Sequence, residues 1–313
     1  NSTAPGVIII GLTAFGGGSS SNNIVQGNYI GTNTNGEVQS GFGNDLGMVI
    51  LLDSLNSLVG GTTAGAGNII AGNGAGIACF GISGAGLLPL NNSFLGNSIY
   101  SNSVGSFQGL GLNLGIDLFD NPTGDFTTFV NVGVNANDAG DPDTPANRYI
   151  NYPVISSVTS DNGQATITYS LDINDAEVGA TGYRVEFFAN DSPDASGNGQ
   201  GQTYLGATTV TGDVTNAVAN LTLPAGVSGA KYISAVTTMT DNSTDGFGHS
   251  SEFSANLLAT LEAATGGAGG GSSGTINLAD TGIKALLVVA IAVTSVTTGL
   301  YILLRRKVYI SGK

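Results

Sequence analysis

The chain has 313 residues, and its 8 basic and 22 acidic residues give a formal net charge of −14. Only Arg148, Arg184 and Lys231 are basic before residue 278, against 21 acidic residues in the same span. A surface so poor in cations cannot neutralise phosphates, which argues against nucleic acid as a partner. The length predicts two domains plus a tail. The only cysteine, Cys79, cannot form an internal disulfide, and its apolar neighbours predict a buried, inert thiol.

Residues 1–147 are rich in glycine and asparagine and contain a repeat. The pattern Asn-x-x-x-Gly-Asn occurs at 23–28, 68–73 and 92–97, and short apolar runs occupy 7–10, 48–52 and 77–80. The step of 24 residues from Asn68 to Asn92 predicts coils of about 22 to 24 residues. Such runs, turned by Gly and Asn, predict a parallel β-helix. Asparagines at a fixed corner can adopt left-handed backbone and form a hydrogen-bonded ladder.

Two segments, 28–32 and 59–73, resemble the right-handed β-helix repeats of large bacterial surface proteins. In those proteins, similar coils precede segments like residues 114–117, 137–143 and 151–154 of this chain. The resemblance covers roughly residues 20–258 and implies a right-handed parallel β-helix, which is expected to occupy residues 1–147 together with its acidic connecting segment. It implies architecture rather than an activity. Because an open β-helix end exposes unpaired strand edges, further coils are expected before Asn1.

β-helix enzymes that cleave polysaccharides combine carboxylates with a basic side chain. Residues 1–147 contain no Arg, Lys or His. A carboxylate pair for glycoside hydrolysis stays open, although no motif joins two of the candidates, which are Glu37, Asp45, Asp53, Asp117, Asp120 and Asp125. We therefore expect no enzymatic activity. The alternative is a carbohydrate-active lyase or hydrolase whose catalytic coils lie upstream.

Three carboxylates, Asp138, Asp141 and Asp143, lie close together in a Gly/Pro-containing segment. Ca²⁺ prefers six to eight oxygen ligands, and clustered acids repel one another without a cation. The segment therefore predicts a calcium site. A solvated acidic turn is the alternative.

Residues 148–258 show a period of two, which predicts antiparallel strands. Expected strands lie at 165–171, 183–187, 203–210, 217–223 and 232–240. This pattern predicts an immunoglobulin-like β-sandwich that closes the β-helix and lifts it from its support. The chain as a whole is thus expected to be all-β except for a C-terminal helix. His249, in a glycine-containing loop, is expected at the surface.

The tail begins with a Gly/Ser-rich linker at 259–277. It continues with Leu278-Ala279-Asp280-Thr281-Gly282, an uncharged apolar run at 285–304 and a basic end at 305–313. Twenty apolar residues are long enough for a transmembrane helix, and the basic end is expected on its cytoplasmic side. The order resembles the LPxTG sorting signal of sortase-anchored surface proteins of Gram-positive bacteria, in the LAxTG variant. The resemblance implies sortase cleavage after Thr281 and attachment to peptidoglycan.

Together these features predict an extracellular protein fixed to the cell wall, which acts in adhesion or structural display. The expected partners are sortase and peptidoglycan, and either neutral glycans or a surface protein. The membrane is contacted only through the C-terminal helix before sorting. A passive stalk without a ligand is a further possibility.

Overall fold

The computed structural model describes residues 4–103, 111–124, 128–173, 180–243 and 245–264. Within these residues the regular structure is twenty strands and three short 3-10 helices, η1 (Thr13–Phe15), η2 (Ser83–Ala85) and η3 (Ala146–Tyr149). The all-β prediction is confirmed for this part of the chain. It belongs to one compact unit, Asn1–Ala264.

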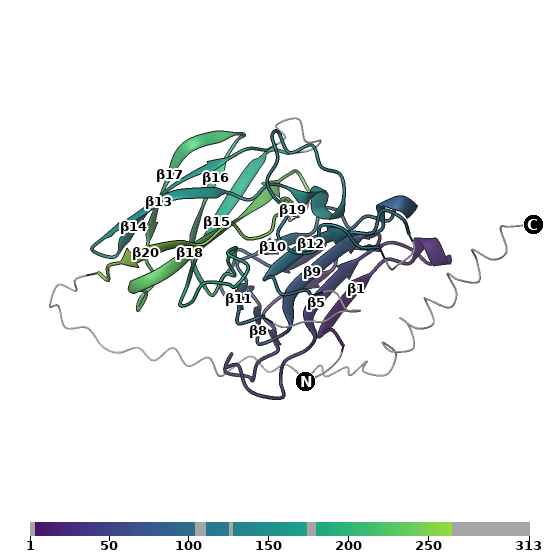
Figure 1. Cartoon of the computed structure of the whole chain (residues 1–313), viewed down its shortest axis with the longest axis horizontal. Helices are drawn as coiled ribbons and strands as arrows, with labels where there is room; N and C mark the ends of the chain where they lie inside the picture. The colour runs from purple at the N-terminus through teal and green to yellow at the C-terminus, as the bar shows by residue number, and fades with distance from the viewer. Residues whose placement is uncertain (1–3, 104–110, 125–127, 174–179, 244, 265–313) are drawn as a thin grey trace, which may run out of the picture. The chain divides into compact units, whose positions relative to one another are not determined.

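Twelve strands in the first half pair with one another in parallel. They are β1 (Val7–Ile10), β2 (Ser20–Ser21), β3 (Ile24–Val25), β4 (Tyr29–Ile30), β5 (Leu46–Leu51), β6 (Ser54–Leu55), β7 (Leu58–Gly60), β8 (Ile69–Ala71), β9 (Ala75–Gly81), β10 (Ser93–Leu95), β11 (Ser98–Tyr100) and β12 (Ile116–Asp120). One sheet has the order β1-β5-β9-β12 (Figure 1). The other sheets have the orders β10-β7-β3, β11-β8-β4 and β2-β6. We call residues 7–120 the parallel stack.

Like side chains lie on like side chains along the stack. Ile50, Cys79 and Leu118 occupy paired positions in β5, β9 and β12, and all three are buried in one apolar cluster. The alternate residues of the same strands, such as Phe80 and Phe119, form a second cluster on the opposite face. Burial on both faces explains why these strands are continuous apolar runs. Cys79 is fully buried, as predicted.

Asparagine ladders run along the corners of the stack. In one ladder the backbone N–H and the side-chain amide of Asn28 donate to Oδ1 of Asn68, and those of Asn68 donate to Oδ1 of Asn97. A second ladder joins Asn44, Asn73 and Asn102 in the same way. The predicted ladder is therefore confirmed. Each rung satisfies a corner N–H that the sheets leave unpaired.

The predicted spacing of the coils was wrong. Bonded rungs are separated by 29 residues between Asn68 and Asn97 and by 40 between Asn28 and Asn68. The 24-residue step joins Asn68 to Asn92, and these lie on different ladders, because Asn92 binds the N–H of Ser57. Nor do these ladder residues adopt left-handed backbone. At several corners the preceding residue does so instead, namely Asn22, Gly27, Asn56, Gly72, Asn91, Gly96 and Ser101.

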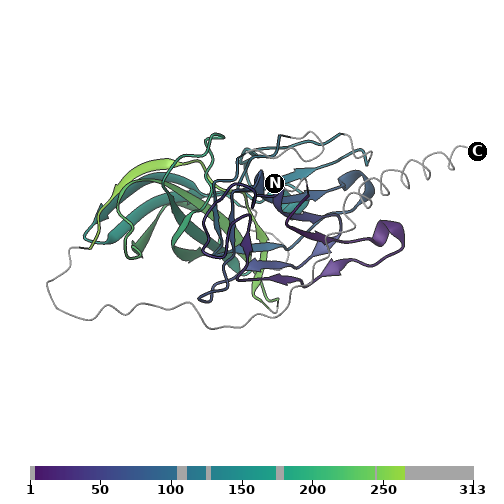
Figure 2. The same cartoon turned by 90° about the horizontal axis from the view of Figure 1, so that it is seen from below.

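The second half is antiparallel. Its strands are β13 (Val154–Asp161), β14 (Gln164–Leu171), β15 (Gly182–Asn190), β16 (Thr203–Val210), β17 (Val214–Thr222), β18 (Gly229–Thr240), β19 (Phe247–Ser250) and β20 (Leu257–Leu261). They form one sheet of order β13-β14-β17 and another of order β16-β15-β18-β19, in which β20 also pairs with β18 (Figure 1). Figure 2 shows the same strands, in teal and green, from below. All five predicted strands overlap strands of the structure. We call residues 154–261 the antiparallel region.

The larger antiparallel sheet is buried on both faces. On one face Val185 and Phe187 of β15 join a core shared with the smaller sheet, where Phe187 meets Tyr169 edge to face at 5.4 Å between ring centroids. On the other face Phe188 belongs to the cluster that fills the parallel stack. The polar residue Glu186, which alternates with the apolar ones, is therefore buried rather than solvated.

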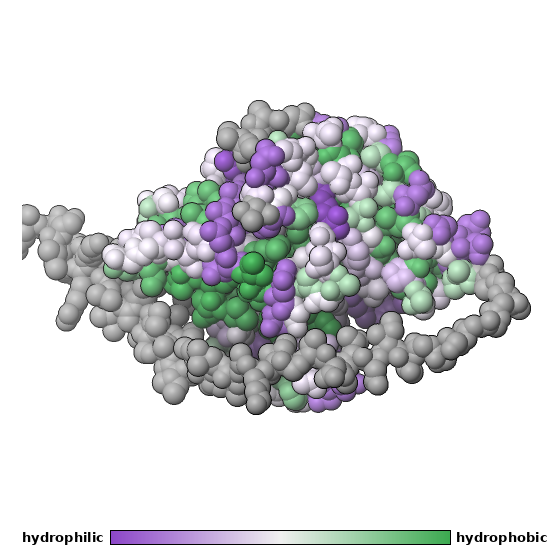
Figure 3. All heavy atoms as spheres, turned by 180° about the vertical axis from the view of Figure 1, so that it is seen from behind, coloured by the Kyte–Doolittle hydropathy of each residue, from purple (hydrophilic) through white to green (hydrophobic). Residues whose placement is uncertain are grey.

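The outer surface is sparsely charged. On the face shown in Figure 3, near-neutral and apolar residues cover most of the described surface, and hydrophilic residues form narrow bands. This agrees with a chain in which only 10% of residues are charged.

The predicted sorting signal lies outside the described residues. This holds for the pentapeptide from Leu278 to Gly282, for the span at 285–304, for the basic end and for most of the linker. Among the residues that the structure does describe, no helix is both long and apolar enough to cross a bilayer.

Candidate functional site

The antiparallel region covers the last strand edges of the parallel stack. An uncovered edge would leave backbone N–H groups unpaired. Here each of the three edge strands β10, β11 and β12 donates to a group from residues 200–252. The bonds run from Phe94 N to Ser250 Oγ (2.8 Å), from Ile99 N to Gly201 O (2.8 Å) and from Leu118 N to Glu252 Oε1 (2.8 Å).

The ladders end on side chains from outside the repeats. Oε1 of Gln200 accepts from the N–H and the side-chain amide of Asn102, each at 3.1 Å. Nε2 of Gln200 donates back to Asn102 O at 2.8 Å. Asn147 terminates another ladder, since its Oδ1 accepts from Asn92 N at 3.0 Å. Both Gln200 and Asn147 are buried, so these contacts fix the loop around Gln200 against the stack.

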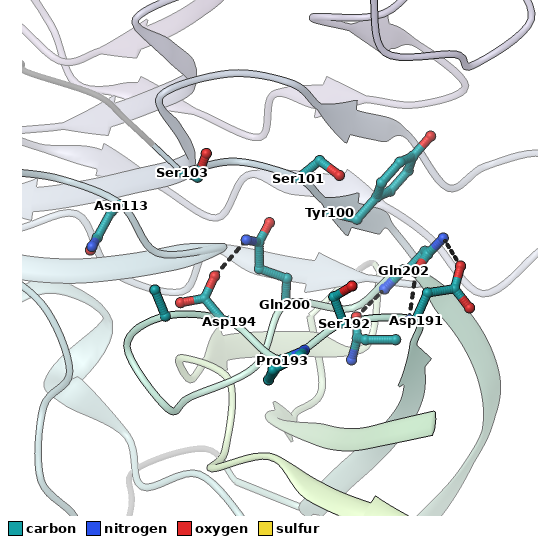
Figure 4. Close-up of a pocket in the computed structure, with 12 residues that line it drawn as sticks. Tyr100, Ser101, Ser103, Asn113, Asp191, Ser192, Pro193, Asp194, Gln200 and Gln202 are labelled. Atoms are coloured by element: carbon teal, nitrogen blue, oxygen red, sulfur yellow. Dashed lines mark hydrogen bonds between the residues drawn. The ribbon is translucent and has the colours of Figure 1, made fainter. Parts of the chain in front are cut away.

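A cavity of about 390 Å³ opens beside Gln200, between the end of β11 and the loop from residue 190 to residue 202 (Figure 4). It is the candidate binding site. The lining groups are hydroxyls, amides and two carboxylates, with one aromatic ring. They belong to Tyr100, Ser101, Ser103, Asn113, Asn190, Asp191, Ser192, Asp194, Gln200 and Gln202, together with Pro193 and Ala195.

Hydrogen bonds hold the carboxylates of the cavity in place. Oδ2 of Asp194 accepts from Nε2 of Gln200 at 2.6 Å. Oδ2 of Asp191 accepts from Nε2 of Gln202 at 2.9 Å, and its Oδ1 accepts from Lys231. These bonds from Lys231 and Gln202 hold the pKa of Asp191 below its usual value. Asp191 is therefore ionised at neutral pH, and the cavity disfavours anionic ligands.

Several lining groups keep their hydrogen-bonding capacity. The side chains of Ser101, Ser103, Asn113 and Ser192 form no hydrogen bond with another described residue. Tyr100, in contrast, donates its hydroxyl to Gly36 O at 2.6 Å, which fixes its ring at one end of the cavity. A fixed ring beside free hydroxyls and amides suits a ligand with an apolar face and many hydroxyl groups.

Of the three residues predicted to bind calcium, Asp141 has a carboxylate that is hydrogen-bonded to the backbone of Asn151. Oδ1 of Asp141 accepts from Asn151 N at 3.1 Å. Burial, and then the charge of Asp138, raises the pKa of Asp143, so these two carboxylates lie near each other. Oδ1 of Asp138 is buried without a hydrogen-bond partner. Within the described residues, no group of three or more acidic, His or Cys side chains has the geometry to hold a metal ion. Calcium binding by Asp138, Asp141 and Asp143 stays a prediction.

A second pair of carboxyl groups lies deep in the junction. Glu252 is 3% exposed and Asp117 is fully buried. Burial raises the pKa of Asp117 to about 7, against the opposing effect of its hydrogen bond from Gly133 N–H. Burial, and then the charge of Asp117, raises the pKa of Glu252 well above its usual value. Glu252 accepts from Leu118 N and Asn135 N, so its role here is to close a strand edge.

Of the other carboxylates considered for catalysis, Glu37 and Asp120 have structural partners, whereas both carboxylate oxygens of Asp53 are buried without a hydrogen-bond partner among the described residues. Asp120 accepts from the N–H of Ser83 at 2.9 Å and from its hydroxyl. Glu37 accepts from Nδ2 of Asn33 at 2.7 Å. Asp125 lies outside the described residues. The absence of enzymatic activity stays a prediction, as does the alternative of a carbohydrate-active enzyme.

The expectation that His249 lies at the surface was wrong. Its side chain is 2% exposed, and Nδ1 accepts from Asn91 N at 3.1 Å. Burial, and then the charge of Arg148, lowers its pKa to about 3. The neutral imidazole therefore belongs to the junction between β19 and the turn before β10.

Sequence reasoning missed the residues of the cavity. The turn Asp191-Ser192-Pro193-Asp194 carried a weak signal, because two acids there flank a proline between predicted strands. Gln200 carried no signal, since its contact with Asn102 spans 98 residues.

Comparison of the chain with protein-family models and with curated proteins gave no match.

Proposed function

We propose that this chain is a surface protein of a Gram-positive-type bacterium, covalently anchored to peptidoglycan and presenting a glycan-binding unit. The anchoring part rests on the order of Leu278-Ala279-Asp280-Thr281-Gly282, the apolar run and the basic end. Sortase would join Thr281 to the wall, and the Gly/Ser-rich linker would give the folded part room to extend.

The finer architecture is part of this proposal. Four sets of parallel strands with asparagine ladders at their corners support a right-handed parallel β-helix. Two antiparallel sheets with a shared core support an immunoglobulin-like β-sandwich. The sandwich acts as the cap of the helix, because it supplies the groups that pair the last strand edges.

The cavity beside Gln200 is the observation that favours ligand binding over a passive stalk. Its free hydroxyl and amide groups match the hydroxyls of a sugar, and the Tyr100 ring offers an aromatic surface. Its carboxylates disfavour acidic ligands. The ligand class that fits best is a neutral glycan.

A glycan array of neutral and acidic oligosaccharides, probed with the full chain, tests this function. We expect the neutral members to bind. Ser192 is exposed at the rim, so Ser192→Trp should fill the cavity without disturbing the core, and we expect it to abolish the binding of neutral members. Thr215→Trp, on the exposed face of β17, is the matched control and should bind like the wild type.

Two results would count against the glycan-binding proposal. One is an array on which the wild-type chain binds no neutral glycan, which would favour the passive stalk. The other is a Ser192→Trp chain that keeps the wild-type profile, which would move the binding site elsewhere.

A further inference from the structure

A second cavity, of about 490 Å³, lies on the same junction but has a different chemistry. It is bounded by the turn after β7, which includes Thr62 and Thr63, and by Arg184 and Tyr204 of strands β15 and β16. The first cavity has no basic lining residue, whereas this one has Arg184.

The guanidinium of Arg184 is held in a fixed orientation. Its Nε donates to Oε1 of Glu186 at 2.9 Å, and its Nη2 donates to the hydroxyl of Tyr204 at 2.8 Å. The side chain of Arg184 is 20% exposed, whereas that of Glu186 is 1% exposed. Glu186 also lines the cavity, but the guanidinium is the more exposed group of the pair and so the more accessible to a ligand.

Glu186 is fully engaged by the protein. Its Oε2 accepts from Gly96 N at 2.8 Å, at the turn between β10 and β11. This carboxylate both closes the stack and orients Arg184. Two donors of the guanidinium are used in these contacts, and they leave the Nη1 group available to a ligand.

The chemistry of the residues that line this cavity indicates which ligand the Arg184 guanidinium would bind. A pre-oriented guanidinium with a free N–H donor favours a carboxylate over a neutral acceptor, because a charge-assisted hydrogen bond is stronger than a neutral one. The hydroxyls of Thr62 and Thr63 lie on an exposed turn and can bind further hydroxyl groups. Glycines at 61, 65, 67 and 96 leave the backbone accessible along the floor. We propose that this cavity binds an acidic sugar of the uronic acid class, through its carboxylate.

A peptide carboxylate is the competing ligand. The lining has few apolar side chains to hold a peptide's own side chains, and its hydroxyls and bare backbone match a polyhydroxylated ring instead. The proposal does not depend on the first cavity, because the two sets of lining residues are different.

Saturation-transfer NMR on the full chain tests the proposal with four probes: D-galacturonic acid, its methyl ester, D-galactose and N-acetyl-alanyl-alanine. We expect galacturonic acid to bind at least about tenfold more tightly than galactose or the ester, since a charge-assisted hydrogen bond is lost in both. We expect the dipeptide to bind no better than galactose.

The double variant Arg184→Gln/Glu186→Gln removes both charges together, so neither is left buried alone. It should lower the affinity of the chain for galacturonic acid to its affinity for galactose. Tyr204→Phe removes the hydroxyl that accepts a hydrogen bond from the guanidinium. It should lower the affinity for galacturonic acid several-fold, while the melting temperature stays close to that of the wild type. Ser192→Trp, in the first cavity, should leave galacturonic acid binding unchanged.

Several outcomes would overturn the assignment. They are equal binding of galacturonic acid and galactose, binding of the dipeptide as tight as that of galacturonic acid, no binding of any probe, and wild-type selectivity in both the double variant and Tyr204→Phe.

Discussion

Gln200 forms with Asn102 the same amide contact that one ladder asparagine forms with the next. Asn102 N–H and Nδ2 donate to Oε1 of Gln200, as Asn73 N–H and Nδ2 donate to Oδ1 of Asn102. Gln200 belongs to the antiparallel region, yet it serves as the last rung of the ladder. The same residue lines the candidate site, so the closure of the stack and the shape of the cavity depend on one side chain.

Replacement of Gln200 by alanine should therefore destabilise the chain. The variant leaves two donors and the carbonyl oxygen of the fully buried Asn102 without their hydrogen bonds, and it removes one of the bonds to Asp194. We expect a loss of about 2–4 kcal/mol in the free energy of unfolding, measured with urea. Gln164→Ala, at an exposed Gln–Thr pair, is the matched control and should change it by less than about 0.5 kcal/mol. Equal effects of the two variants would contradict the role of Gln200.

The raised pKa of Asp117 predicts a pH-dependent stability. In the unfolded chain an aspartate has a pKa near 4, whereas in the folded chain that of Asp117 is about 7. The contribution of Asp117 to the free energy of unfolding is fully present below pH 4. It is lost as pH rises through 7, since ionisation in the buried site is unfavourable. The full loss is on the order of 4 kcal/mol.

Asp117→Asn keeps the shape and removes this titration, so the comparison reports the ionisation of Asp117 together with its effect on Glu252. We expect the stability of the wild type relative to Asp117→Asn to fall between pH 5 and pH 8, in urea unfolding at both values. A constant difference across this range would show that Asp117 titrates normally.

His249 is the only histidine in the chain, so its NMR signals can be assigned without ambiguity. Because burial and Arg148 lower its pKa to about 3, we expect its ring C–H resonances to stay constant between pH 5 and pH 8. The neutral form contributes stability that is present above pH 6.5 and is lost as pH falls towards 3. A titration midpoint near 6.5 would place the ring in solvent.

Calcium should stabilise the acidic segment if it binds Asp138, Asp141 and Asp143 as the sequence predicts. A cation would relieve the repulsion between Asp138 and Asp143 that raises the pKa of Asp143. We expect a higher melting temperature in millimolar Ca²⁺ than in chelator, by about 2–4 °C for each kcal/mol of binding. Asp138→Asn/Asp143→Asn should remove the difference. Identical melting curves for the wild type would reject the site.

The sequence predicted those features that depend on local pattern. Apolar runs around Ile50 and Cys79 marked the strands of the stack, and the Gly-Asn pairs marked its corners. Pairing between coils was harder to predict, because the asparagines of neighbouring corners look alike and only the fold shows that Asn92 and Asn68 lie on different ladders. Alternation at 183–187 predicted a strand, but it did not show that the face of β15 carrying Glu186 would be buried against the stack.

The residues that build the site could not be found in this way, because their contacts are distant in sequence. Glu252 reaches Leu118 across 134 residues, and Gln200 reaches Asn102 across 98. Each of these side chains would be read as a solvated polar residue between strands. The burial that gives them their role comes from the packing of the antiparallel region on the last strands.

The most direct test of the proposed function is mass spectrometry of the chain released from purified cell walls by a murein hydrolase. We predict a C-terminal peptide that ends at Thr281 and carries a fragment of peptidoglycan on its carboxyl group, with residues 282–313 absent. A chain that is recovered with residues 285–304 intact and with no peptidoglycan attached to Thr281 would contradict the account.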